Sequence, residues 1–346
     1  MAAFTIDNEV KMLRGIASVF PRHHLQVNNL LESDAEIIHL KENDFNYLVV
    51  KTDGIHEEIS HKLYTDPYLI GWIGVTATIS DLAAVGSQPL GLLLNLQVPI
   101  DCEDAWMKKY QQGVNAACAE YKVSILGGDT HFSDGISVST TGIATIGEGM
   151  PLMRTMLPGE HLYSTGKLGL GNAFAYSVYF DRRNPVHYQP VARLKESKII
   201  RDFASGCMDT SDGLFPALSV LSEINSVGFQ IIPFVEDIIH EDAIKILEAS
   251  NIPHWAFLAG PHGEYELLFT IAPEQQIAFE NACKSEDWIP VYLGKIIPGN
   301  MVYFDSEVFH IECQPAIIAN LYHEAGGDIK TYFELLMKQH TLFTKP

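Results

Sequence analysis

The stretch Ile-Ser-Asp-Leu-Ala-Ala-Val-Gly, residues 79–86, ends an apolar segment that decides the fold. From Tyr68 to Val85 the sequence has no proline and carries apolar residues on all sides, and it stops at Gly86, which suits the left-handed end of a helix. The segment therefore predicts a buried helix. Asp81 lies within it, and a carboxylate among apolar neighbours needs a partner that offsets the cost of its burial.

Apolar runs that end in turn residues surround this helix and predict strands. One run ends at Asp53-Gly54 and another at Pro99, while a short run before Gly127 is expected to break at the glycine pair that begins there. The expected strands are 45–52, 92–98, 123–126 and 136–146, and a second helix is expected at about 102–121. This alternation predicts an α+β (mixed α/β) fold.

A second unit is expected after residues 147–159, which hold three glycines and two prolines and have the composition of a linker. The sequence thus predicts an N-terminal domain at 1–148 and a C-terminal α/β domain at 149–346. Within the latter we expect strands at 162–165 and 265–271 and helices at 172–180, 191–204 and 214–225.

Composition narrows the function. The chain has 346 residues and a net charge of -20, which argues against nucleic acid or an anionic membrane surface as a partner. A phosphorylated ligand would need divalent cations between its phosphates and the protein's carboxylates. The five cysteines include no C-x-x-C pair, and no apolar run approaches the roughly 18 residues of a membrane span. The sequence therefore predicts a reduced, cytoplasmic protein.

Aspartates recur where the predicted elements end. Asp53 follows the first strand, Asp129 follows Gly127-Gly128, and Asp212 precedes a helix. Each has a simpler interpretation, because Asp-Gly is a common turn, an aspartate before a helix is a common N-cap, and Asp81 could face solvent. Turn chemistry does not require two glycines before Asp129-Thr130, whereas such glycines let backbone amides approach a phosphate closely. Together the aspartates predict a divided metal site that holds a phosphate ligand.

The chain resembles the thiamine-monophosphate kinases, within the wider aminoimidazole ribonucleotide synthetase-like (PurM-like) ATP-binding superfamily. The likeness spans most of the sequence. It rests on Thr52-Asp53, Ile79 to Gly86, Gly127-Gly128-Asp129-Thr130, Arg154 with Pro158-Gly159-Glu160, Thr165-Gly166 with Leu168-Gly169, and Met208-Asp209-Thr210-Ser211-Asp212-Gly213-Leu214.

The resemblance implies a two-domain PurM-like fold whose N-terminal sheets form a barrel across a homodimer. It implies Mg²⁺ and ATP as cofactors and a small phosphorylated substrate as partner. The implied metal ligands are Asp34, Asp53, Asp81, Asp129 and Asp212. The implied nucleotide-binding residues are Thr52, Gly127, Gly128, Thr130, Arg154 and Ser211. The implied catalytic residues are Asp129, Asp212 and Arg154, and the candidates on the substrate side are Asp209, His56, Glu264 and Tyr265.

The sequence departs from the family on the substrate side. The kinases carry Glu-Gly-Val-His-Phe where this chain has Gly54-Ile55-His56-Glu57-Glu58, and they carry Gly-Gly-Glu-Asp-Tyr where it has Pro261-His262-Gly263-Glu264-Tyr265. The first hypothesis is an ATP-dependent kinase that phosphorylates thiamine monophosphate. The alternatives are a synthetase-like enzyme that activates another small substrate and a homologue that binds nucleotide without turnover.

Overall fold

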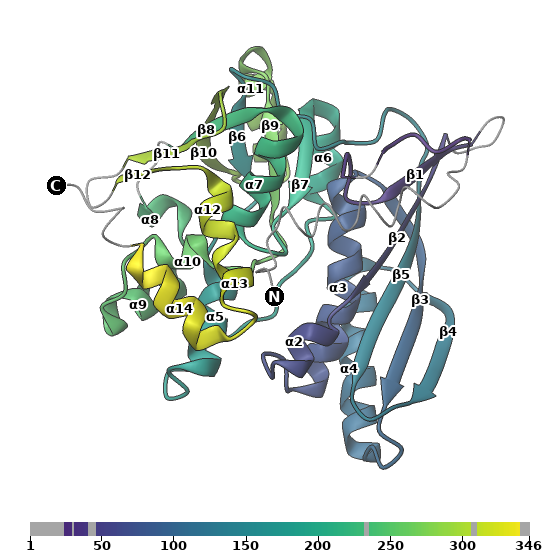
Figure 1. Cartoon of the computed structure of the whole chain (residues 1–346). Helices are drawn as coiled ribbons and strands as arrows, with labels where there is room; N and C mark the ends of the chain where they lie inside the picture. Colours follow the sequence, from purple (N-terminus) through teal and green to yellow (C-terminus); the bar gives the residue numbers. More distant parts are fainter. Residues whose placement is uncertain (1–23, 30, 41–45, 232–234, 306–309, 340–346) are drawn as a thin grey trace.

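The computed structural model describes residues 24–29, 31–40, 46–231, 235–305 and 310–339 (Figure 1). Within these ranges the chain forms two mixed β-sheets with helices packed against them, as the α+β prediction requires. The first sheet lies within residues 36–146 and the second within 161–313. The domain boundary at residue 148 stays a prediction. No helix in the described ranges is long and apolar enough to cross a membrane.

The first sheet has five strands in the order β1-β2-β5-β3-β4, with β3 and β4 parallel and the other neighbours antiparallel. Helices α3 and α4 cover one of its faces, and α2 lies at one end (Figure 1). The elements are β1 Glu36–His39, β2 Tyr47–Gly54, α2 His56–Ser60, α3 Pro67–Ala84, β3 Gln88–Val98, α4 Asp104–Tyr121, β4 Ile125–Phe132 and β5 Ser137–Ile146.

Helix α3 confirms the buried helix predicted at 68–85. It begins with Pro67 at the first helical position, and the Asp66 side chain accepts a hydrogen bond from the Tyr68 N–H. Every residue from Ile70 to Ala84 is buried, because α3 packs on the first sheet and on α4 and also contacts the second sheet at β7. The helix thus carries Asp81 into the boundary between the two halves of the chain.

The second sheet has seven strands in the order β12-β11-β8-β10-β6-β9-β7, with β8 and β11 parallel. Its strands are β6 His161–Ser164, β7 Ala204–Asp209, β8 Val227–Ile231, β9 Leu267–Ile271, β10 Val291–Pro298, β11 Val302–Asp305 and β12 His310–Cys313. The helices are α5 Leu170–Tyr179, α6 Glu196–Phe203, α7 Leu214–Asn225, α8 Val235–Ile238, α9 Glu241–Ser250, α10 Ala256–Ala259, α11 Gln276–Ser285, α12 Pro315–Ala319, α13 Leu321–Glu324 and α14 Ile329–Lys338, with a short 3₁₀ turn at Pro273–Gln275.

Two predicted boundaries are wrong by five residues or more, while the strand predicted to begin at residue 92 begins four residues earlier, at Gln88. The strand expected to break at Gly127-Gly128 instead continues through both glycines as β4. A Cβ atom on Gly128 would lie 1.9 Å from the Leu94 carbonyl oxygen of β3, so the close approach of that strand requires glycine here. The helix expected at 191–204 begins only at Glu196, because residues 191–193 have no helical structure and 194–195 form a turn. Phe45, the expected start of the first strand, lies outside the described residues.

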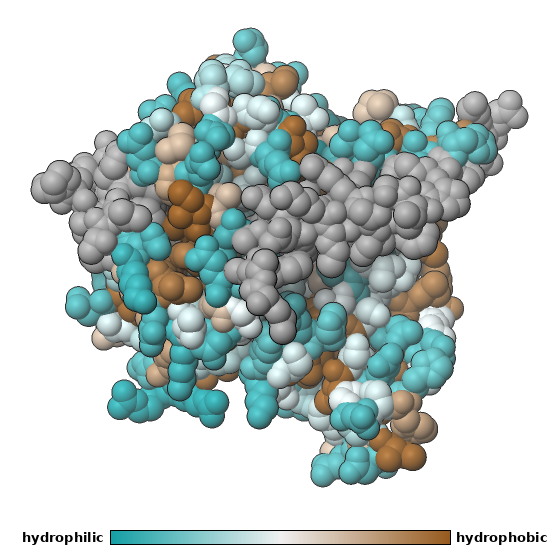
Figure 2. Space-filling view, viewed as in Figure 1, coloured by the Kyte–Doolittle hydropathy of each residue, from teal (hydrophilic) through white to brown (hydrophobic). Residues whose placement is uncertain are grey.

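The edge strand β4 is exposed along its whole length. Leu126 and Phe132 are 57% and 70% exposed, and Leu93 of the neighbouring β3 is exposed as well. Figure 2 shows hydrophobic surface on the right-hand edge of the molecule, where the first sheet lies. An apolar edge strand with unpaired backbone groups invites a second chain.

Candidate active site

Three buried carboxylates meet at the boundary between the two halves. Asp34 lies just before β1, Asp81 in the last turn of α3 and Asp209 at the end of β7. One carboxylate oxygen from each lies within 4.8 Å of the others. We call Asp34, Asp81 and Asp209 the carboxylate cluster.

Two cations contact the carboxylate cluster. Arg154 forms a bidentate pair with Asp34, with Nη2 2.8 Å from Oδ1 and Nε 3.2 Å from Oδ2. Lys51 of β2 places its Nζ 3.1 Å from Asp81 Oδ2. These ion pairs offset part of the repulsion among the three carboxylates.

The environment raises the pKa of two members of the cluster. Burial is the main cause for Asp209, whose pKa rises to about 7, and the nearby charge of Asp34 adds to it. The hydroxyls of Ser80 and Ser211 donate to the two oxygens of Asp209, at 2.7 and 3.0 Å, and hold the carboxylate in one orientation. Burial also raises the pKa of Asp81 well above its usual value, and the charge of Lys51 opposes that rise.

The cluster fits a magnesium ion. Asp81 Oδ2 is buried and accepts no hydrogen bond from the described residues, so cations are what offset its charge. Asp81 also lies at the C-terminal end of α3, where the helix dipole disfavours a carboxylate and favours positive charge. Closely spaced carboxylate oxygens are the hard ligands that Mg²⁺ prefers.

Asp53 and Asp212 border the cluster. Asp53 lies two residues after Lys51 and therefore on the same face of β2, and its charge contributes to the raised pKa of Asp81. The charge of Asp212 likewise contributes to the raised pKa of Asp209. Asp212 is not the N-cap of α7, since that position is Gly213 and no side chain caps the helix. Asp81 does not face solvent, because it is only 5% exposed.

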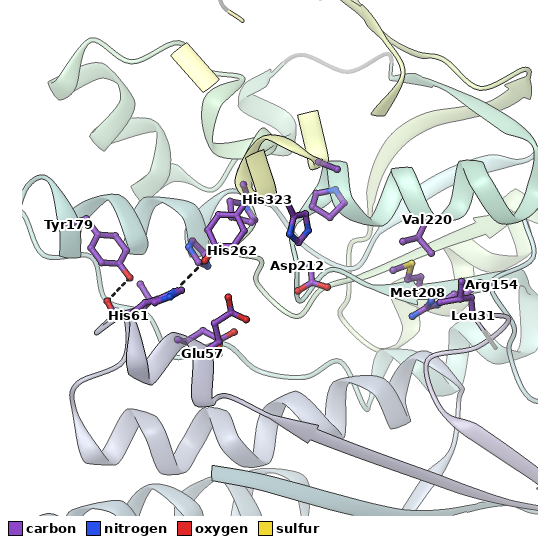
Figure 3. Close-up of a pocket in the computed structure, with 16 residues that line it drawn as sticks. Leu31, Glu57, His61, Arg154, Tyr179, Met208, Asp212, Val220, His262 and His323 are labelled. Carbon is purple, nitrogen blue, oxygen red and sulfur yellow. Dashed lines mark hydrogen bonds between the residues drawn. The ribbon is translucent and has the colours of Figure 1, made fainter. Parts of the chain in front are cut away.

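A cavity of about 300 Å³ adjoins the carboxylate cluster. Figure 3 shows Arg154, Met208 and Val220 at one end, His61 and Tyr179 at the other, and Asp212 between them. The remaining walls are Leu31, Glu57, Glu58, Leu63, Pro216, Pro261, His262, Ala319, Tyr322 and His323. Arg154 therefore belongs both to the cluster and to the cavity wall.

The far end of the cavity combines carboxylates with neutral rings. Burial raises the pKa of Glu58 to about 7, and the charges of Asp212 and Glu57 add to this rise. Burial, with the nearby His61, lowers the pKa of His262 to about 4, so its imidazole is neutral at neutral pH. Tyr179 donates to the carbonyl oxygen of His61 at 3.1 Å. The cavity thus favours a ligand with positive charge at this end.

Three predicted substrate residues do not line the cavity. His56 is exposed at the start of α2. Glu264 is buried and accepts a hydrogen bond from the Gly171 N–H of α5, at 2.9 Å. Tyr265 is buried within the core of the first half. The fourth candidate, Asp209, lies in the carboxylate cluster, beside Asp34 and Asp81.

A second predicted group lies on the opposite face of the first sheet, which we call the open face because α3 and α4 cover the other one. Thr52 pairs there with Thr141 of β5, with 2.7 Å between the hydroxyl oxygens. Asp129 lies on β4, bonded to the Thr130 N–H and to His131. Since β5 and β3 separate β2 from β4, Asp129 is roughly 14 Å from β2. Within one chain it does not join the carboxylate cluster.

Comparison with known proteins identifies the family. Residues 32–146 match the model described as AIR synthase related protein, N-terminal domain. A thiamine-monophosphate kinase from Bacillus subtilis is 28% identical over 286 residues, which are 78% of this chain and 86% of that protein. One from Methanospirillum hungatei is 32% identical over 237 residues, which are 66% of this chain and 76% of that protein. This chain belongs to the thiamine-monophosphate kinase family.

A solved member of the thiamine-monophosphate kinase family shows the same fold. The structure described as AaThiL complexed with AMPPCP and TMP superposes with a TM-score of 0.71 at 20% identity, covering 88% of this chain and 94% of that one. The PurM-like fold predicted from the sequence is thus confirmed. Whether the first sheets close into a dimeric barrel stays a prediction.

One departure from the family's sequence has a clear steric cause. At Gly263, where the family pattern has an acidic residue, a Cβ atom would lie 1.4 Å from the Thr210 carbonyl oxygen. No side chain fits there in this backbone. The carboxylates at the His61 end of the cavity instead come from α2, as Glu57 and Glu58, which no sequence motif marks. Only the placement of α2 beside His262 shows that they face a cavity.

Proposed function

We propose that this protein is an ATP- and Mg²⁺-dependent kinase that converts thiamine monophosphate into thiamine diphosphate. The position of Arg154 carries this proposal, because this side chain pairs with Asp34 of the carboxylate cluster and also lines the adjoining cavity. An active site that transfers a phosphoryl group needs its metal ligands next to the pocket that binds the acceptor. The relative solved with AMPPCP, an analogue of ATP, and TMP supports the same pair of ligands.

The cavity suits thiamine monophosphate as acceptor. Its phosphate would lie at the end formed by Arg154, and its cationic thiazolium ring would lie toward Glu57, Glu58 and His61 (Figure 3). A guanidinium is a good partner for phosphate oxygens, and carboxylates attract a ring that carries positive charge. Glu57 and Glu58 would then take over the role of the acidic residue that Gly263 excludes.

Magnesium would be held by Asp34, Asp81 and Asp209, with Asp53 and Asp212 at their border, and would neutralise the charge that spreads over the transferred phosphoryl group. Asp209, predicted from the sequence as a substrate-binding residue, would therefore be a metal ligand. Ser80 and Ser211 would act through Asp209 by fixing its orientation. Thr52 would contact the nucleotide from the open face, and Gly127, Gly128 and Thr130 would contact it from the exposed edge strand β4.

The reaction needs no general base. A phosphate oxygen of the acceptor is already anionic near neutral pH, so it attacks the γ-phosphorus of ATP directly, and the bond to the β-phosphate oxygen breaks as ADP leaves. Arg154 would stabilise the negative charge on the phosphoryl group during its transfer. Its guanidinium stays protonated, because the adjacent Asp34 raises its pKa although burial acts to lower it. The apolar walls at Met208 and Val220 would limit the access of water.

A homodimer would complete the site. Asp129 cannot join the carboxylate cluster of its own chain, yet it lies on an exposed apolar edge strand that invites pairing with a second copy. Pairing of β4 with the first sheet of a partner would bring Asp129 toward the partner's metal site and would hide Leu126 and Phe132. We therefore propose the closed dimeric barrel, with each active site built from two chains.

The decisive experiment is a product assay. Purified protein with Mg-ATP and thiamine monophosphate should form ADP and thiamine diphosphate in equal amounts, measured by chromatography. Thiamine itself, which lacks the phosphate acceptor, is the control substrate and should give no product. If neither product forms at saturating substrate, a screen for ligands that stabilise the Mg-ADP complex against heat would separate a different acceptor from a nucleotide-binding protein without turnover.

A further inference from the structure

Lys51 stands out in the apolar pattern of β2. Tyr47 and Val49 precede it on the same face of the strand and are 8% and 0% exposed. The pattern would place an apolar or small residue next, because a lysine on a face that packs against a helix loses hydration. The Lys51 side chain nevertheless retains only 28% exposure and extends to Asp81, whose side chain is 7% exposed.

The surroundings of Lys51 are those of a metal ion. Its Nζ lies 3.1 Å from Asp81 Oδ2, and the charges of Asp53 and Asp34 also act on it. The ammonium group of Lys51 thus lies among the negative charges of Asp81, Asp53 and Asp34, which offset the cost of burying it. It therefore provides a permanent positive charge where three carboxylates converge.

We propose that Lys51 is a resident cation of the carboxylate cluster and replaces one divalent ion on its Asp81 side. A divalent ion on Asp81 Oδ2 would lie close to the ammonium group and would be repelled by it. The chain should therefore bind one metal ion fewer than the same cluster without the lysine. It should also keep the cluster folded when metal is removed.

The proposal concerns the metal site of the proposed kinase, and it deepens that function by dividing the positive charge between side chains and ions. Arg154 and Lys51 hold Asp34 and Asp81 respectively, whereas Asp209 has only hydroxyl partners in the hydrogen bonds described above. Asp209 is thus the member of the cluster with the greatest need for a divalent ion. Lys51 acts as a positioning residue that directs the ions toward Asp209, Asp53 and Asp212.

The test counts bound ions without using activity. Mn²⁺ would replace Mg²⁺, and electron paramagnetic resonance would measure its stoichiometry in the wild type, Lys51→Met and Lys51→Arg. Lys51→Met should bind one additional Mn²⁺ per chain, and its melting temperature should fall in EDTA and recover with Mg²⁺ more than that of the wild type. Lys51→Arg should match the wild type in both measurements. The exposed Lys108→Met provides a control for loss of charge alone.

A double variant keeps the test decisive if Lys51→Met does not fold. Lys51→Met with Asp81→Asn removes both charges of the pair, so it should fold and bind as many Mn²⁺ ions as the wild type. Equal stoichiometry in the wild type and Lys51→Met, or an additional ion in Lys51→Arg or in the double variant, would overturn the role of Lys51. Because no substrate is present, a failed kinase assay leaves this result intact, whereas absence of Mn²⁺ from every variant would overturn the metal site itself.

Discussion

The carboxylate cluster and the open face of the first sheet use the same residue type in opposite ways. Asp34, Asp81 and Asp209 are buried, paired with cations or hydroxyls, and assembled from both halves of one chain. Asp129 is exposed and bonds only locally, within its own strand, in the interactions described above. A carboxylate that is buried beside other carboxylates requires a cation to offset its charge. An exposed carboxylate has no such requirement, and its role depends on what binds next to it.

The largest effect is expected from Asp209→Asn, which removes one negative charge from the buried carboxylate cluster. Loss of this negative ligand should lower kcat by about 100- to 1000-fold, as removal of a preorganised electrostatic contact does elsewhere. Steady-state assays of thiamine diphosphate formation would measure it. The exposed Asp101→Asn is the matched control and should retain normal activity. An Asp209→Asn enzyme within threefold of the wild type would show that the cluster is not the metal site.

Mixing two inactive variants tests whether the open face works across a dimer. Asp129→Asn alone should lower activity by about 10- to 100-fold, because its carboxylate would serve the partner's site. When the Asp129→Asn and Asp209→Asn proteins are mixed and reassembled in equal amounts, about half of the dimers should contain one chain of each. Each mixed dimer would hold one intact site and one inactive site, so about a quarter of wild-type activity should return. Failure of mixed dimers to regain activity, with mixing verified by native mass spectrometry, would place Asp129 outside the partner's site.

The smallest effect concerns Glu264, a buried carboxylate outside the cluster. Burial raises its pKa to about 8, although the Gly171 N–H opposes the rise. Between pH 4.5 and 8 Glu264 is therefore protonated in the folded state but ionised in the unfolded state. The uptake of this proton on folding opposes stability increasingly as the pH rises, so the free energy of unfolding falls as the pH rises from 4.5 toward 8. Compared with the wild type, Glu264→Gln should gain stability over this window, by on the order of a few kcal/mol.

Urea unfolding of the wild type and Glu264→Gln at several pH values, with Mg²⁺ present, would measure this difference. Glu58→Gln serves as a comparison, because burial raises the pKa of Glu58 to only about 7 and its effect should end at a lower pH. A stability difference between the wild type and Glu264→Gln that does not change with pH would contradict the raised pKa of Glu264. The same measurement would show whether the buried carboxylate of Glu264 is tolerated without a bound cation when a backbone N–H donates a hydrogen bond to it.

The sequence predicted the elements whose signals are local. The apolar run of α3 and the start of α7 at Leu214 are as expected, because period, proline and glycine act within a few residues. The continuation of β4 through Gly127-Gly128 was missed, since the need for glycine comes from Leu94 on another strand. Pairing across a sheet leaves little trace in a single segment.

The candidate site was predictable only in part. Motifs marked Asp34, Asp81 and Arg154, but the position of Lys51 opposite Asp81 depends on how β2 packs against α3. The cavity residues Glu58 and His262 come from distant segments, and no spacing links them. Sequence motifs therefore marked many of the aspartates, while the structure shows which of the carboxylates lie close enough to interact.

The carboxylate cluster also has a consequence for the order of folding. Its first and last members, Asp34 and Asp209, are more than 170 residues apart in the sequence, and Asp209 reaches the others only when β7 has docked beside α3. On a ribosome, the chain up to α3 would already hold Asp34 and Asp81 while their common partner is still unmade. The proposed metal site would thus form late in synthesis, and a nascent chain that stops before β7 would lack one of the three carboxylates that are proposed to hold the ion.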